Sequence, residues 1–135
     1  MLLDAQNLFS DAQKITTTAV STNVVCLAKG LLKEMAFGTP IPFIAQVVEK
    51  FEGATSVKLV VETCDDTEFN EAETLVETGV IPVAELVDGY KFPVAYVPKG
   101  NKGYIRTKYV VDGTATAGAI TAGFVAAHDN SYQDM

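Results

Sequence analysis

Residues 103–127 read GYIRTKYVVDGTATAGAITAGFVAA, and this stretch decides the predicted fold. Side chains alternate between two faces in both halves, a period of two that is typical of strands. Asp112-Gly113 separates the halves, and an Asp-Gly pair between alternating runs is a strong signal for a tight hairpin turn. We therefore expect two paired strands joined at this turn. The residues expected to share a face are Ile105, Thr107 and Tyr109 in the first half, and Ile120, Ala122, Phe124 and Ala126 in the second.

The second half of this stretch is poor in bulky side chains, because it contains Gly118, Gly123 and six alanines. Small residues weaken a strand by themselves and usually mark a place where another backbone or layer comes very close. The pattern therefore predicts a packed sheet with a second layer against it. None of its side chains is a catalytic candidate.

The rest of the chain is divided by turn residues into short runs rich in β-branched side chains. Residues 28–37 are the exception, since Leu27, Leu31 and Met35 recur at helical spacing while Gly30 opposes a helix; a short helix and a long loop both remain open. Strands are expected within residues 15–27 (two, with a turn at 21–23), 41–51, 55–64, 75–81, 83–87 and 90–97. The fold class predicted is an all-β, jelly-roll-like sandwich of about eight strands with at most one short helix.

The chain is expected to form one domain over residues 1–135, with an N-terminal arm at 1–12 and a flexible tail at 128–135. No apolar run is long enough for a membrane span. Met1 to Asn7 lacks the features of a secretion signal, so we expect folding in a cytoplasm. The net charge of −7 argues against binding of nucleic acid.

The charge is unevenly distributed along the chain. Residues 62–88 contain nine acidic side chains and no basic one, whereas residues 90–111 contain five basic side chains and no acidic one. Such asymmetry can orient one protein against another or one subunit against its twin. The alternative is that both segments are solvated loops and exposed strand faces.

The sequence offers little for catalysis, and we expect neither an enzyme nor a bound cofactor or metal. His128 is the only histidine, whereas a metal enzyme on a jelly roll needs several. The acidic loop at residues 65–71 lacks the ligand spacing and glycine of a calcium loop. The loop at 99–103 does not match a phosphate-binding motif. Cys26 and Cys64 are expected to be thiols in a reducing compartment, with a disulfide as the alternative.

Two ends of the sequence carry a family resemblance. The run DAQNLFSDAQ at residues 4–13, followed by Ser21-Thr22-Asn23-Val24, resembles the opening of a family of tailed-bacteriophage capsid cement (decoration) proteins. Tyr104-Ile105-Arg106, Tyr109 and the glycine-threonine-alanine run from Gly113 to Gly123 resemble the closing signature of that family. Looser matches lie between them in the same order, and residues 26–37 depart from the family pattern.

The resemblance implies a jelly-roll protein on the outer capsid surface of the virion, made in the cytoplasm of the host bacterium. Such a protein clamps adjacent copies of the major capsid protein, often as a homodimer, and has no catalytic activity or cofactor. A non-catalytic β-sandwich binding module of a phage particle, for example one for carbohydrate, is the first alternative, although the chain has no tryptophan. A small jelly-roll enzyme is the second. The candidate capsid or subunit contacts are Leu8, Phe9, Lys99, Lys102, Arg106 and Lys108.

Overall fold

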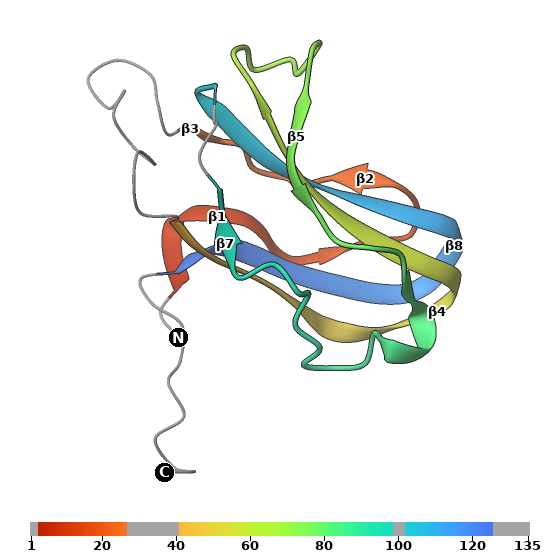
Figure 1. Ribbon diagram of the computed structural model, residues 1–135. Helices are drawn as coiled ribbons and strands as arrows, with labels where there is room; N and C mark the ends of the chain where they lie inside the picture. Colours follow the sequence, from red (N-terminus) through yellow and green to blue (C-terminus); the bar gives the residue numbers. More distant parts are fainter. Residues whose placement is uncertain (1–2, 27–40, 99–101, 126–135) are drawn as a thin grey trace, which may run out of the picture.

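The computed structural model describes residues 3–26, 41–98 and 102–125, and the regular structure in this part of the chain is almost entirely strand (Figure 1). The expected helix or loop at residues 28–37 and the expected tail at 128–135 lie outside the described residues. Within the described ranges, no helix is long and apolar enough to cross a membrane. The elements are β1 (Leu3–Lys14), β2 (Ala19–Val20), β3 (Val25–Cys26), β4 (Ile41–Cys64), β5 (Glu73–Glu77), β6 (Ile81–Pro82), the 3-10 turn η1 (Val83–Glu85), β7 (Tyr96–Val97) and β8 (Tyr104–Val125).

The two long strands β4 and β8 form an antiparallel ribbon along almost their whole length. Pairing runs from Phe43 opposite Phe124 to Cys64 opposite Tyr104. The hairpin predicted at Asp112-Gly113 is therefore wrong, because both halves of β8 pair with β4 and not with each other. Gly113 does have the positive φ of 91° that an Asp-Gly turn requires, but it pairs with Ala54 inside a continuous strand. Asp112-Gly113 therefore lies where the long strand bends, and the chain does not reverse its direction there.

The ribbon folds over at one end, so that its two halves lie in separate layers (Figure 1). Every register shift between β4 and β8 falls between Val47 and Ser56, and bulges of this kind bend and twist a strand. Gly53, with φ of 89°, lies within this bend. Gly118 lies against the Phe51 ring, which a Cβ on Gly118 would approach to 2.4 Å. The prediction that small residues mark a close approach is confirmed at Gly118.

Shorter strands flank the ribbon on both sides and follow it around the bend. On the β8 side, β1 pairs with the second half of β8, while β2 and β3 pair with its first half. On the β4 side, β5 and β6 pair with the second half of β4, and residues 89–97 hydrogen-bond to its first half. Each layer is thus antiparallel, with one half of β4 and one half of β8 at its centre and the shorter segments at its edges, and this order of neighbours is that of a jelly roll. The predicted all-β sandwich is confirmed.

The core lies between the two layers, and its members on the long strands β4 and β8 largely alternate along the chain. On β4, Val57, Leu59 and Val61 point inward. Phe9, Phe43 and Phe124 form an aromatic cluster whose ring centroids are 5.2 to 6.4 Å apart. Because strands from both sheets contribute, the core joins the layers.

Three local predictions are corrected by the structure. The expected N-terminal arm is the edge strand β1 from Leu3 onward, because it pairs with β8 and contributes a buried Phe9. The strand expected at 83–87 is absent: Val83–Glu85 form the 3-10 turn η1, capped by Pro82 at the end of β6, and the chain then continues without regular structure. The strand expected at 90–97 is reduced to β7 and an isolated bridge at Lys91, with Pro93 between them.

Candidate interaction surface

The residues proposed from sequence as contacts occupy different environments. Phe9 is fully buried in the core, so it is not the exposed apolar side chain that the sequence suggested. Leu8, its neighbour on β1, is half-buried. Lys99 lies outside the described residues. Arg106 and Lys108 are half-buried on the outer face of the sheet that contains β5, and the exposed Lys102 precedes β8.

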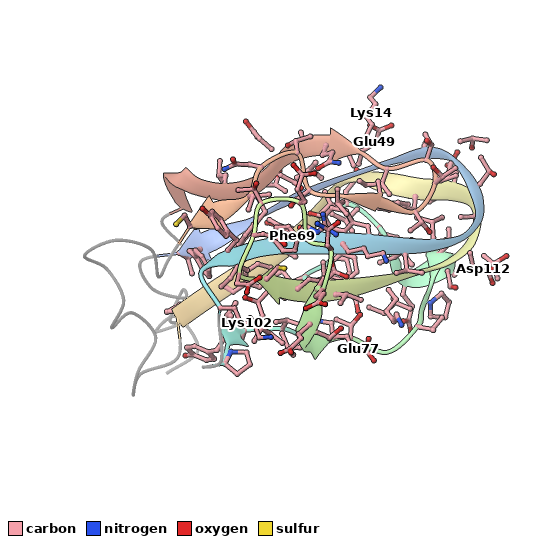
Figure 2. All side chains as sticks on the ribbon, turned by 90° about the horizontal axis from the view of Figure 1, so that it is seen from above. Lys14, Glu49, Phe69, Glu77, Lys102 and Asp112 are labelled. Atoms are coloured by element: carbon pink, nitrogen blue, oxygen red, sulfur yellow. The ribbon has the colours of Figure 1, made fainter. Side chains whose placement is uncertain are left out.

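Arg106 is engaged within its own sheet. Its cross-strand partner is Glu62, and Arg106 Nε donates a hydrogen bond to Glu62 Oε2 over 3.0 Å. The guanidinium group also stacks on the ring of Phe69, with 4.2 Å from Cζ to the ring centroid. Figure 2 shows Phe69 over β8, in the loop between β4 and β5. These contacts neutralise Arg106 and shield it, which makes it a weak candidate for binding another protein.

Lys102 and Lys58 also have acidic partners within the chain. Lys102 Nζ donates to Glu73 Oε1 over 2.6 Å, and this hydrogen bond raises the pKa of Lys102. Lys58 Nζ lies 3.5 Å from Glu77 Oε2. The acidic segment thus neutralises several of the cations of β4 and β8 in the same molecule. Lys102 and Arg106, two of the basic residues of the segment 90–111, are therefore paired within the molecule with the acidic segment 62–88.

Lys108 differs from the other cations of this face. It lies between Val20 of β2 and Val60 of β4, which are its cross-strand neighbours. In the part of the chain that the structure describes, no acidic side chain forms an ion pair with it. Val20 beside it is 39% exposed. The row Val20–Lys108 therefore combines an available cation with exposed apolar surface.

The loop after β4 is organised by Asp66 and Phe69. Asp66 Oδ1 accepts a hydrogen bond from the backbone N–H of Phe69 over 2.7 Å, and Phe69 has a positive φ of 54°. The ligand atoms of Cys64, Asp65 and Asp66 lie within 4.8 Å of one another. Three such groups are fewer than the six to eight oxygen ligands that calcium takes. The contacts of Asp66 instead stabilise a turn that lays Phe69 on the sheet.

The two cysteines are free thiols. Both are opposite Tyr104, Cys26 on one side of β8 and Cys64 on the other. Two strand spacings of about 4.8 Å separate their backbones, whereas a disulfide needs Cα atoms within about 7 Å. The sheet geometry therefore favours the thiols expected from the sequence over the disulfide.

A buried chain of hydroxyl groups connects the two sheets, and the sequence reasoning did not find it. Thr107 Oγ1 donates to Tyr109 Oη over 2.9 Å, and Tyr109 Oη lies 2.7 Å from Ser10 Oγ. Ser10 Oγ donates to Gln13 Oε1 over 2.7 Å, so Tyr109 is left to donate to Ser10. Burial raises the pKa of Tyr109, while the hydrogen bonds to Ser10 and Thr107 oppose that shift. The signal in the sequence was Tyr109 itself, because a tyrosine on the inward face of a strand needs a hydrogen-bond partner for its buried hydroxyl group.

The motifs that carried the family resemblance meet at this chain. Ser10 and Gln13 come from the opening run, and Tyr109 comes from the closing signature. Thr22 and Asn23, from the second motif, hydrogen-bond to β1 through Gln13 Oε1 and the carbonyl groups of Leu8 and Phe9. These residues thus fix the fold by joining the sheets, and their chemistry is structural.

In a comparison with protein families, the model of Bbp16 matches residues 9–124. The matched range extends from the middle of β1 to the end of β8 and includes the whole hydroxyl chain. A comparison with curated proteins finds no match.

Proposed function

This chain belongs to the Bbp16 family, which is phage-associated, and we propose that it is a structural virion protein: a cement protein that binds the outer surface of a phage head. In this role it clamps adjacent copies of the major capsid protein. The observation that carries the proposal is that residues of the opening and closing motifs of the cement-protein resemblance, distant in sequence, meet in one inter-sheet network.

The physical properties of the fold suit this role. A head packed with DNA pushes outward, and a clamp stabilises the shell by adding buried area across subunit joints. Each site needs only a few kcal/mol, because binding to the assembled form stabilises it by mass action at many equivalent places. A net charge of −7 also limits capture of the protein by free DNA during assembly.

The surface favoured for the capsid contact is the row Val20–Lys108, with Leu8 on the other sheet as a second candidate. Lys108 is a cation without an ion-pair partner among the described residues, and Val20 supplies exposed apolar area. An acidic surface on the major capsid protein is the complementary partner. Phe9 and Arg106 leave the set of contacts, because the first is in the core and the second is paired with Glu62.

The proposed oligomer is a homodimer. A two-fold dimer presents the same surface to two capsid subunits at once, which suits a clamp. Sedimentation equilibrium of the purified protein tests this part, and a monomer at all concentrations would remove the dimer from the proposal while leaving capsid binding open.

The decisive experiment compares phage heads with and without this protein. Heads lacking it should open at lower temperature than complete heads, and adding the purified protein should restore their stability. Lys108→Glu is expected to reduce occupancy on the heads, whereas Lys91→Glu, a matched charge change at an exposed lysine on the other sheet, should leave occupancy unchanged. Heads whose heat resistance does not depend on the protein would contradict the cement role.

A further inference from the structure

Residues 3–26, here called the N-terminal strap, are bound to one another by side chains. Gln13 connects β1 to the segment before β3, because its Nε2 donates to the Val20 carbonyl over 2.9 Å and its Oε1 accepts from the Thr22 N–H over 3.0 Å. Asn23 closes the same gap from the other direction: its N–H and its Nδ2 donate to the carbonyls of Phe9 and Leu8. The strap is therefore one connected piece, although its strands belong to two different sheets.

The backbone of the strap is attached to a single neighbour. Among the described residues, β1, β2 and β3 all pair with β8 and with no other strand. The connections between them follow the same rule, since Ile15 N–H donates to the Gly118 carbonyl and the Thr16 carbonyl accepts from Ala115 N–H. The strap is thus the edge of both sheets on one side of the sandwich.

The ladder between β1 and β8 is loose. From Leu3 to Lys14 the strap advances eleven residues while β8 advances six, from Val125 to Ala119, and three register shifts take up the excess. Residues inside bulges do not complete the ladder, so backbone pairing holds β1 weakly for its length. The hold comes instead from Phe9 in the core and from the hydroxyl chain at Ser10 and Tyr109.

From this arrangement we propose that the N-terminal strap opens from β8 as one cooperative unit, at a lower free energy than global unfolding. Proteins open in contiguous units whose stability follows local packing and hydrogen bonding. Here the internal hydrogen bonds of Gln13 and Asn23 make β1, β2 and β3 move together. The hydrogen bond between Ser10 and Tyr109 holds them to β8. Opening exposes the β8 edge in both sheets. This inference is independent of the proposed capsid role.

Native-state hydrogen exchange, followed by mass spectrometry across increasing denaturant, tests the proposal on the full chain. Peptides from the strap should share one protection factor that is lower than that of β4. In Tyr109→Phe, protection of the whole strap should fall roughly tenfold further, as expected for loss of one buried hydrogen bond. Leu86→Ala changes the core on the far side of β4. It should lower the protection factor of β4 more than the protection factor of the strap.

The double variant Gln13→Ala/Asn23→Ala provides the sharper outcome, because it removes the side-chain hydrogen bonds that connect β1 to residues 20–23 and leaves the hydrogen bond between Tyr109 and Ser10 in place. In this variant β1 should exchange separately from β2 and β3, whereas in the natural protein they exchange together. If Tyr109→Phe does not fold, Ser10→Ala replaces it, because it removes the same hydrogen bond between Ser10 and Tyr109 through a smaller change. Strap peptides that exchange only with β4, or that exchange separately in the unmodified protein, would overturn the proposal.

Discussion

Tyr109 Oη lies 2.7 Å from Ser10 Oγ, although 99 residues separate the two in the chain. Tyr109 belongs to one sheet and Ser10 to the edge strand of the other, so this contact joins the layers of the sandwich. In an otherwise apolar core, such a bond is satisfied only when both strands have the correct register. The pair therefore stabilises the fold and specifies the position of β1.

Replacement of Tyr109 by Phe should lower the free energy of unfolding by about 1 to 3 kcal/mol, because Ser10 and Thr107 lose a buried partner while the ring is kept. Urea unfolding followed by circular dichroism measures the change. Tyr90→Phe is the matched control: Tyr90 is half-buried, and its ring contact with Phe92 is unaffected by loss of the hydroxyl. Equal destabilisation by both changes would show that the hydroxyl chain contributes nothing special.

Alkaline pH should unfold the protein through Tyr109. Burial raises the pKa of Tyr109 in the folded state, so this group stabilises the fold fully below the unfolded pKa of about 10. As pH rises above that value, the unfolded chain loses the proton while the folded chain retains it, and stability falls. Absorbance of tyrosinate at alkaline pH should show one tyrosine that ionises only upon unfolding. In Tyr109→Phe that late step should disappear.

Gly118→Ala should destabilise the protein by roughly 2 kcal/mol or more, because the new Cβ would collide with the Phe51 ring and Gly118 has a φ of 145°. Gly79→Ala is the control, since no atom lies within 4 Å of its added Cβ. That change should be neutral or stabilise slightly by restricting the unfolded chain. Thermal melting of both variants gives the comparison, and similar melting temperatures would contradict the packing of the bend.

The stack between Arg106 and Phe69 should hold the acidic loop on the sheet. A double-mutant cycle with Arg106→Ala and Phe69→Ala is expected to give a coupling energy of about 0.5 to 2 kcal/mol. Phe69→Ala alone should also increase hydrogen exchange across residues 65–72. Lys58→Ala, which removes a more exposed ion pair with Glu77, should leave that loop unchanged. A coupling energy near zero would mean that the stack is incidental.

The sequence predicted the class of the fold because strand alternation is a local property. The faces of β4 and of both halves of β8 follow directly from the period of two in their side chains. The role of Asp112-Gly113 could not be predicted in the same way, because a positive φ at glycine serves a hairpin and a bent strand equally well. The partner strand decides between them, and β4 is distant in the sequence from β8.

The candidate surface shows the same division. Lys102, Arg106 and Lys108 were equivalent basic residues in the sequence, but cross-strand pairing gives Glu62 to Arg106 and valines to Lys108. The apolar pair Leu8-Phe9 was read as an exposed arm, because nothing nearby in the sequence indicates that β8 accepts it as an edge strand. Burial depends on contacts across the whole chain.

By itself, the sequence determined that this is an acidic all-β domain with one side of each strand in a core, because composition and periodicity are properties of neighbouring residues. The tertiary structure alone decided that the two long strands bend together, that Tyr109 meets Ser10, and which cations remain available at the surface. Those outcomes depend on pairing between residues distant in the chain. Such pairs contribute to stability only once the two sheets have packed against each other.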